Sequence, residues 1–478
     1  MAHWPTIFQL YLILLFVHVA QFSEATWPGP RLFNLSGSIN NQSTGDLGTT
    51  WAVLIAGSKG YYNYRHQADI CHAYQILKKG GLNDENIIVF MYDDIAFNPL
   101  NPVPGIIFNN PRGPDVYADV PKDYTGENVT AANFHAVLLG NKAGVSGGSG
   151  KVLASKPNDK IFIYYADHGG PGVLGMPNTP FIFADDLIQV LNLKYASRTY
   201  SEMVIYVDAS ESGTMFQGML PMDWNIYVTT ATNMYQNSWA TYCPETNPPP
   251  PAGLEVCIGD LYSISWMENS ESEDLRNETL RQQYLKVKMR TYNNHSSHGS
   301  QVMQYGTLHI SNETVSEYQG SLPWSLNMNN SAQSFEPMGV VNQRDADLYS
   351  MWQTYKKSTK VSQQKDELLK EINEITAYRA HLDRSVDVIK GYLLGKGHES
   401  VRSEGAALVD DWKCLKSMVR TFETHCGSLT QYGMKHTRTF ANICNNGVTA
   451  EAMDKASKMA CSRYNLGQWN PAFVGYSA

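Results

Sequence analysis

The sequence lacks an apolar run long enough to cross a membrane, because its longest stretch, Ile7–Ala20, falls short of the roughly 20 residues that a bilayer requires. It also lacks a cluster of basic residues: 37 Lys and Arg stand against 45 Asp and Glu, for a net charge of −8. Nucleic acid is therefore not an expected partner, since binding phosphates needs a basic surface. No Cys-x-x-Cys pair or neighbouring His pair has zinc spacing, so neither a metal nor a cofactor is predicted.

The first residues instead have the pattern of a secretory signal peptide over residues 1–25. The apolar run is followed by the small residues Ser23 and Ala25, which fit a cleavage site, although no Lys or Arg precedes the run. The alternative interpretation is a buried N-terminal helix. Seven Asn-x-Ser/Thr glycosylation triplets agree with entry into the secretory pathway. They begin at Asn34, Asn41, Asn128, Asn277, Asn294, Asn312 and Asn329.

The seven cysteines fit an oxidising compartment. Cys243 and Cys257 flank a proline-rich loop, and a bridge between them would cost little loop entropy. Cys71 is left over, on the apolar face of an amphipathic segment, and is expected to be a buried, inert thiol. The other four crowd near the C-terminus and predict two disulfides across a small helical domain, with three connectivities open. These four are Cys414, Cys426, Cys444 and Cys461.

Between residues 51 and 332, short apolar runs alternate with amphipathic stretches, which is the signature of an α/β domain. The segment Gln67–Lys79 has helical spacing of its apolar residues. The apolar runs predict buried strands of a largely parallel sheet. They lie at Trp51–Ala56, Ile87–Phe90, Ile161–Tyr165, Val204–Val207 and Ile226–Val228. We therefore predict an α/β fold with a mostly parallel sheet flanked by helices.

The pattern changes after about residue 333. Asp366–Leu394 has the periodicity of one long amphipathic helix, with charges on the face opposite the apolar residues. Further helical pattern, with the four cysteines, continues to Cys461. We predict a leader over 26–50, an α/β domain over 51–332, a linker or activation peptide over 333–360, and an all-α, disulfide-bonded domain over 361–478.

Two predicted strand ends carry side chains suited to catalysis. One run leads into His168 and Gly169, and another leads into Ser210. Ligands of parallel sheets bind beyond the carboxyl ends of the strands, so these residues would face one crevice if the strands are neighbours. A base beside a hydroxyl, with the N–H groups of Gly169 and Ser210 pointing inward, is the geometry of acyl transfer. The alternative is a structural His with its hydrogen bonds satisfied.

Longer motifs give the chain a resemblance to a known family. The runs Trp51–Asp69, Tyr165–Pro177, Asn342–Asp347, Asp410–Cys414 and Cys426–Gly433 resemble those of plant legumains, also called vacuolar processing enzymes. The resemblance covers nearly everything after the leader. It implies a caspase-like cysteine endopeptidase that cleaves proteins and peptides after Asn, and less readily after Asp in acid.

The resemblance also implies roles for individual residues. His168 matches the catalytic His, Asn63 the Asn that orients it, and Asp167 the acidic neighbour. The S1 pocket, which would hold the substrate Asn, combines donors and acceptors, and a carboxamide needs both. Its residues would be Arg65, Asp208, Ser238 and Asp260.

The C-terminal domain resembles the legumain prodomain, which caps the active site until acid releases it. On that resemblance the cysteines would pair as Cys414–Cys444 and Cys426–Cys461. Asn342, in the linker, is a candidate for self-cleavage.

The main departure from the family is Ser210, which stands where legumains have the nucleophilic Cys. A thiol beside a His can ionise near neutral pH, whereas a hydroxyl needs a base backed by an acidic group. Asn63 is uncharged, and we expect His168 to be largely protonated at vacuolar pH, so activity should be severely impaired. Asp208 replaces a family Glu, and its carboxylate reaches less far into the pocket.

Three functions remain open. The first is the precursor of an asparaginyl endopeptidase that processes vacuolar, including seed storage, proteins with impaired activity. The second is a pseudoenzyme that binds Asn-containing peptides or partner proteins, and the third is a peptide ligase, against which Ser210 counts. Pro171 and Ala240 match positions that tune hydrolysis against ligation, without deciding between them. The prodomain would be the chain's own inhibitor, and the vacuole its destination, with secretion from the cell as the alternative.

Overall fold

The computed structural model describes residues 48–295, 297–320, 339–358, 363–395, 402–464 and 475–478. The predicted signal peptide and the glycosylation triplets at Asn34, Asn41 and Asn329 lie outside the described residues. These described residues form one compact unit. Within the described ranges, no helix has the length and apolar character needed to span a membrane.

The centre of the fold is a six-stranded sheet with strand order β11-β8-β7-β3-β1-β2. Neighbouring strands are parallel except β11, which pairs antiparallel with β8. Most of these strands are apolar runs buried on both faces, as a parallel sheet between helices requires. They are β1 (Thr50–Ala56), β2 (Ile87–Phe90), β3 (Lys160–Ala166), β7 (Glu202–Asp208), β8 (Ile226–Thr230) and β11 (Met303–Gly306). The predicted strands are confirmed, most with slightly longer ends.

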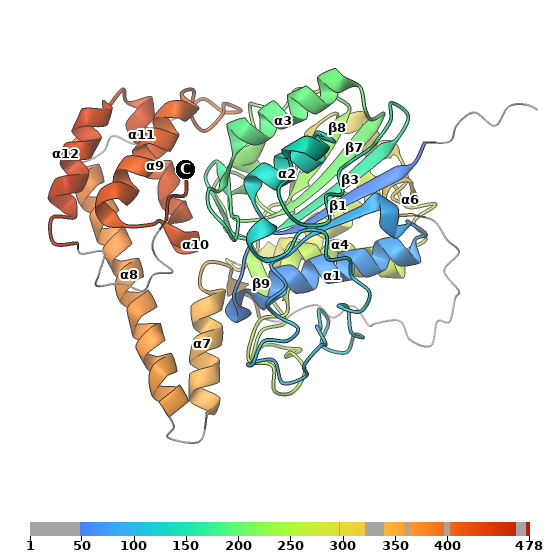
Figure 1. The fold of residues 1–478 in the computed structure, drawn as a ribbon, viewed down its shortest axis with the longest axis horizontal. Coiled ribbons are helices and arrows are strands. Elements are labelled where there is room, and N and C mark those ends of the chain that lie inside the picture. Colours follow the sequence, from blue (N-terminus) through green and yellow to red (C-terminus); the bar gives the residue numbers. More distant parts are fainter. Residues whose placement is uncertain (1–47, 296, 321–338, 359–362, 396–401, 465–474) are drawn as a thin grey trace, which may run out of the picture. The chain divides into compact units, whose positions relative to one another are not determined.

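Helices cover both faces of this sheet (Figure 1). Successive strand residues point to opposite faces, so Leu54 of β1 packs in one hydrophobic core and Val53 in the other. The core around Leu54 includes α1 (Tyr64–Lys79), α4 (Leu261–Ser272) and α5 (Leu280–Thr291). The core around Val53 includes α2 (Ala131–Leu138) and α3 (Ala184–Ser197). The short α6 (Ser316–Gln319) follows β11. The α/β fold class is confirmed, and Cys71 is a buried free thiol as expected.

Two small antiparallel sheets extend the fold. The first follows β3 directly and consists of β4 (Gly169–Gly170), β5 (Val173–Leu174) and β6 (Ile182–Phe183). The second has the order β10-β9-β12 and consists of β9 (Trp239–Thr241), β10 (Gly259–Asp260) and β12 (Val341–Asn342). The expected disulfide Cys243–Cys257 closes the loop between β9 and β10.

The C-terminal part is all helical, as predicted. Its core packs against Val173 and Phe183 of the sheet that follows β3. The disulfides Cys414–Cys444 and Cys426–Cys461 are the pairing implied by the resemblance. The helices are α8 (Gln363–Leu393), α9 (Trp412–Cys426), α10 (Thr430–Gly433), α11 (Thr437–Asn445) and α12 (Ala450–Ala460).

The segment predicted as a linker, 333–360, contains regular structure. Its strand β12 pairs with β9, with Val341 opposite Ala240 and Asn342 opposite Trp239. The helix α7 (Ala346–Lys357) follows. The linker therefore joins the α/β domain as an edge strand, and the domain boundaries stay predictions.

Candidate active site

The strands that lead into the two candidate catalytic residues are neighbours. β3 pairs with β7 in parallel, with Ala166 opposite Asp208, so His168 and Ser210 each follow a strand end by two residues. Both side chains are buried. The two strand ends are therefore neighbours at the carboxyl edge of the sheet, as expected, and the region between them is called the crevice below.

His168 is oriented by Asn63. The distance between His168 Nε2 and Asn63 Oδ1 is 2.8 Å. The amide nitrogen of Asn63 donates to Lys59 O and to Gln431 Oε1, both at 2.9 Å, which turns its oxygen towards the His. His168 Nε2 therefore carries the proton, and its Nδ1, which has no hydrogen-bond partner, carries the lone pair.

The electrostatics of His168 correct one expectation. Burial, with the nearby charges of Arg65, Arg344 and Arg379, holds the pKa of His168 well below its usual value. The prediction that acid protonates this imidazole is therefore wrong for the closed proprotein, because desolvation and the arginines both disfavour a second positive charge.

Ser210 is hydrogen-bonded to groups other than His168. Its hydroxyl donates to Gln343 Oε1 at 3.2 Å and accepts from the backbone N–H of Ser238 at 3.1 Å. Gly169 packs against the backbone of Ser210, since a Cβ added at Gly169 would approach the backbone oxygen of Ser210 to 2.6 Å. The two residues of the predicted base–hydroxyl pair share the crevice without a hydrogen bond between them.

A linker side chain, that of Gln343, occupies the crevice. Its Nε2 donates to Asp167 O at 2.5 Å and lies 3.3 Å from His66 Nε2. Its backbone oxygen accepts from Arg65 Nη2 at 3.4 Å. The preceding Asn342, the candidate for self-cleavage, accepts through its side chain from the N–H of Arg344 at 3.0 Å, and its cleavage stays a prediction.

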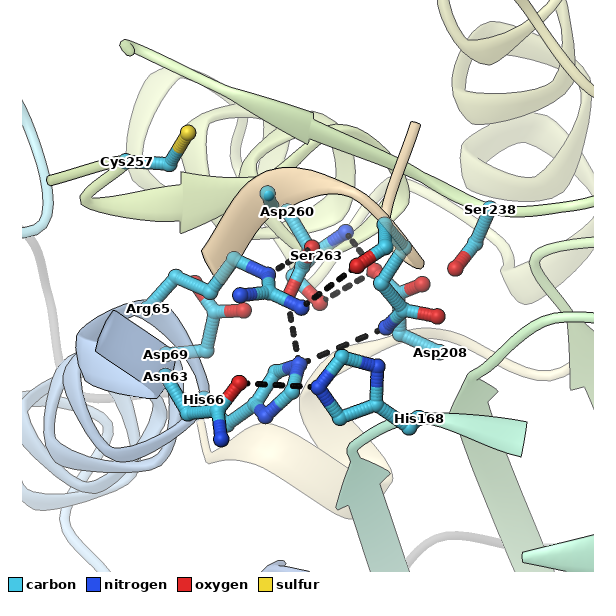
Figure 2. Close-up of polar contacts among 12 residues, drawn as sticks. Asn63, Arg65, His66, Asp69, His168, Asp208, Ser238, Cys257, Asp260 and Ser263 are labelled. Atoms are coloured by element: carbon cyan, nitrogen blue, oxygen red, sulfur yellow. Dashed lines mark hydrogen bonds and ion pairs between the residues drawn. The ribbon is translucent and has the colours of Figure 1, made fainter. Parts of the chain in front are cut away.

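The four residues expected to form the S1 pocket lie together beside the crevice, as Figure 2 shows. Arg65 Nε donates to Asp260 Oδ1 at 3.0 Å. Asp208 Oδ2 accepts from the N–H and the hydroxyl of Ser263, at 3.1 and 2.7 Å. The shorter side chain of Asp208 is thereby held back towards α4.

Several polar atoms of this group are buried and lack a hydrogen-bond partner. They are Arg65 Nη1, Ser238 Oγ, Asp208 Oδ1 and Asp260 Oδ2. The Arg65 nitrogen and the Ser238 hydroxyl can donate hydrogen bonds, and the two carboxylate oxygens can accept them. Asp260 Oδ2 also lies 3.5 Å from His66 Nε2. A ligand with both an acceptor and a donor could satisfy the four atoms.

Buried carboxyl groups crowd this pocket. Burial, then the neighbouring charge of Asp260, raises the pKa of Asp208 to about 8. Burial likewise raises the pKa of Asp260 and holds that of Asp69 well above its ordinary value. Carboxyls this close to one another share protons at neutral pH, because they cannot all ionise in a low-dielectric site.

The helical domain touches the crevice through α10 and α11. Gln431 of α10 contacts both Asn63 and Asp347 of α7. Thr437 donates to Pro171 O at 2.6 Å, and Met434 packs on Gly170. Sequence reasoning missed these contacts, since nothing in the pattern of a helical domain shows which face it presents.

Comparisons with known proteins agree with this arrangement. Residues 50–321 match the profile of the Peptidase C13 family, and residues 370–461 match that of the legumain prodomain. The chain belongs to the peptidase C13 family. The resemblance to legumains is thereby confirmed, and the C-terminal helices are a prodomain.

Curated relatives cover nearly the whole chain. The vacuolar-processing enzyme beta-isozyme of Arabidopsis thaliana is 56% identical, over 98% of each chain. The vacuolar-processing enzyme of Ricinus communis is 59% identical over 90% of this chain and 88% of the relative. The legumain of Canavalia ensiformis is 57% identical over 91% and 93%.

Proposed function

We propose that the chain is the precursor of a vacuolar asparaginyl endopeptidase whose crevice binds peptides through an Asn side chain, and whose Ser210 leaves little hydrolytic activity. The observation that carries this proposal is the group of buried polar atoms without hydrogen-bond partners around Arg65. An unsatisfied buried group costs about 1–3 kcal/mol, so this group favours a ligand that supplies the missing partners.

A carboxamide supplies them best. Its oxygen can accept from Arg65 Nη1 and from the Ser238 hydroxyl, while its NH2 group can donate to Asp208 Oδ1 and to Asp260 Oδ2, which can accept a second bond beside His66 Nε2. An apolar side chain would leave all these atoms unpaired, and sites of this kind reject such analogues strongly. A substrate Asp would face two carboxyls, and the raised pKa of Asp208 lets the pocket admit it by donating a proton.

The chemistry at Ser210 supports weak activity. A hydroxyl attacks only if a base removes its proton, and His168 Nδ1, which follows the neighbouring strand, has a lone pair without a hydrogen-bond partner. The resulting imidazolium would have the uncharged Asn63 behind it and arginines nearby, which disfavour it. Thiolate attack avoids this step, so the Ser at this position removes most of the rate.

A pseudoenzyme is the second candidate. The observation that favours it is the hydrogen bond from Ser210 to Gln343, in place of one to His168. In that case the crevice would bind Asn-containing peptides or partner proteins, and the prodomain would regulate access. Ligation is the least supported, because it needs the same acyl-enzyme as hydrolysis.

The test compares the full-length proprotein with Ser210→Cys and Ser210→Ala in acid. Prodomain release and turnover of an Asn-containing fluorogenic peptide are followed together. We expect rapid cleavage with Cys, and slow or no cleavage with Ser. Equal turnover by the Ser and Cys forms would refute the account of the base, and activity equal in the Ser and Ala forms would assign the natural chain to the pseudoenzymes.

Peptide recognition is tested separately in the Gln343→Ala background, which removes the side chain that occupies the crevice. We expect the Asn peptide to bind, the matching Leu peptide not to bind, and Ser238→Ala to weaken Asn binding by about 1–3 kcal/mol. Equal affinity for the Asn and Leu peptides would refute the proposed Asn-binding pocket, whatever the result of the catalytic test.

The prodomain is proposed as the chain's own inhibitor, because its α10 contacts Asn63 through Gln431. Among the described glycosylation triplets, Asn277, Asn294 and Asn312 are exposed and Asn128 is half-buried, which suits a vacuolar glycoprotein. Whether the sites carry sugar is read by mass spectrometry after glycosidase treatment.

A further inference from the structure

His66, Asp167 and His168 form a second cluster of functional side chains in the crevice. One ligand atom of each lies within 4.8 Å of the other two, and all three side chains are buried. His66 comes from α1 and the other two follow β3, so their separation in sequence hides the cluster from any search for metal-ligand spacing. Two imidazoles and a carboxylate are the ligand set of many catalytic zinc sites, in which a fourth position stays open.

The cluster contains polar atoms that nothing in the described residues satisfies. Both carboxylate oxygens of Asp167 and Nδ1 of His168 are buried without a hydrogen-bond partner. The carboxylate cannot turn away, because it packs closely against Gly57 and Gly175. The carboxylate has His66 Nδ1 3.4 Å from its Oδ1, which is longer than a good hydrogen bond, and a bound cation would compensate it better.

An acceptor lies behind the outer nitrogen of each imidazole, and on binding a metal the inner nitrogen of His66 would exchange its hydrogen bond with Ser58 for the ion. His168 Nε2 donates to Asn63 Oδ1 at 2.8 Å, which leaves its Nδ1 unprotonated. His66 Nε2 lies 3.5 Å from Asp260 Oδ2, and its Nδ1 lies 3.4 Å from Asp167 Oδ1 and 2.6 Å from Ser58 Oγ. A metal-bound His characteristically has such an acceptor behind its outer nitrogen, which fixes the ring and the tautomer.

The spacing is close to that of a bound zinc ion. Zn–N and Zn–O bonds of about 2.0–2.2 Å in tetrahedral geometry place ligand atoms about 3.3 Å apart. His66 Nδ1 and Asp167 Oδ1 are already 3.4 Å apart. The two rings stand at 88° with centroids 4.9 Å apart, and ligand atoms that now lie within 4.8 Å of one another would have to move closer on binding. Arg65, Arg344 and Arg379, which also lower the pKa of His168, are the opposing charges. Each is paired with a carboxylate, in turn Asp260, Glu211 and Asp347, which offsets part of the repulsion.

We propose that His66 Nδ1, His168 Nδ1 and an Asp167 oxygen bind one divalent transition-metal ion, with Zn²⁺ the best fitted. A bound metal occupies the Nδ1 lone pair with which His168 would accept the proton of Ser210. Zinc binding should therefore suppress hydrolysis by Ser210. In the proprotein the Gln343 amide nitrogen lies 3.3 Å from His66 Nε2. An amide N–H there favours the tautomer with the proton on Nδ1, whereas metal binding needs the proton on Nε2. The linker therefore opposes the metal, and its departure exposes the site. The inference does not depend on which peptide the crevice binds.

The experiment uses Co²⁺ as a spectroscopic probe on the full-length chain. Tetrahedral Co²⁺ absorbs visible light far more strongly than hydrated Co²⁺, and Zn²⁺ added afterwards should displace it and abolish the absorption. We expect one ion per chain, with affinity at least tenfold lower in Asp167→Asn and in His168→Gln. Gln343→Ala should bind at least as tightly as the natural chain. His425→Ala is the matched control, because His425 pairs with Asp454 at the prodomain surface, 2.7 Å apart.

Three results would overturn the proposal. They are no tetrahedral spectrum in either the natural chain or Gln343→Ala, unchanged affinity in both His168→Gln and Asp167→Asn, or loss of binding in His425→Ala. Both ligand substitutions keep the side-chain volume nearly constant, and thermal unfolding without metal checks that each variant is folded. If one of them unfolds, the other decides the result.

Discussion

Replacing Arg379 should release the prodomain from the crevice. Arg379 of α8 is buried and holds Asp347 of α7 through two contacts, at 2.6 and 2.8 Å. Without it, Asp347 keeps only the N–H of Leu348 and the amide of Gln431. Removing one partner of a buried ion pair costs about 3–5 kcal/mol. We take about 3 kcal/mol, because these two donors remain, and that corresponds to about a hundredfold larger open population.

Native-state hydrogen exchange measures this opening directly. The free energy of opening is read from backbone amides of α10 and from those around Asn63, which exchange when the two parts separate. Arg379→Ala should lower it by about 3 kcal/mol, whereas Arg384→Ala, on the exposed side of the same helix, should leave it within about 0.5 kcal/mol. Arg379→Ala combined with Asp347→Ala should recover part of the loss, since no buried charge then lacks a partner. Equal exchange in the Arg379 and Arg384 variants would refute the reasoning.

Two further predictions concern stability and docking. Burial lowers the pKa of Lys194 from 10.5 to about 8, so the unfolded chain binds more protons between these values, and stability should rise with pH across that window. Lys194→Met should raise the free energy of unfolding at neutral pH by about 1–3 kcal/mol and flatten that rise, as urea titrations at several pH values would show; an unchanged slope would contradict the assignment. Gly170→Ala would bring a Cβ into Met434 of the prodomain and should increase opening in the exchange experiment, whereas Gly391→Ala, which faces open space, should not. Equal effects of the two glycine substitutions would show that Met434 does not pack there in solution.

The strands and long helices could be predicted because their signal is local. Buried parallel strands are continuous apolar runs, and α8 has one apolar stripe along its length. The ends were less certain: the apolar pattern stops at Tyr165, but the hydrogen-bond ladder continues to Ala166 because β1 and β7 extend beside it. The strand propensity of a segment does not show how far the adjacent strands extend beside it.

Site residues could be predicted where a sequence motif contains them. Contacts between residues far apart in the sequence could not. His168, Ser210 and the residues of the proposed pocket could be placed by strand ends and by resemblance. The side chain of Gln343 could not, because it follows the two-residue strand β12 and reaches Ser210 only through the pairing of that strand with β9. The pKa of His168 was also missed, because arginines from the α/β domain, the linker and the prodomain determine it together.

The pairing of β12 with β9 has a consequence for the matured protein. While the linker is in place, the backbone groups of Trp239–Thr241 are hydrogen-bonded to β10 on one side and to the linker on the other. Removal of the linker would leave one side of β9 as an open strand edge, and open edges can pair with an extended chain. Such an edge would offer its backbone groups to an extended peptide and equally to a second copy of the chain. Short incoming segments, including those of another copy, compete for it according to concentration.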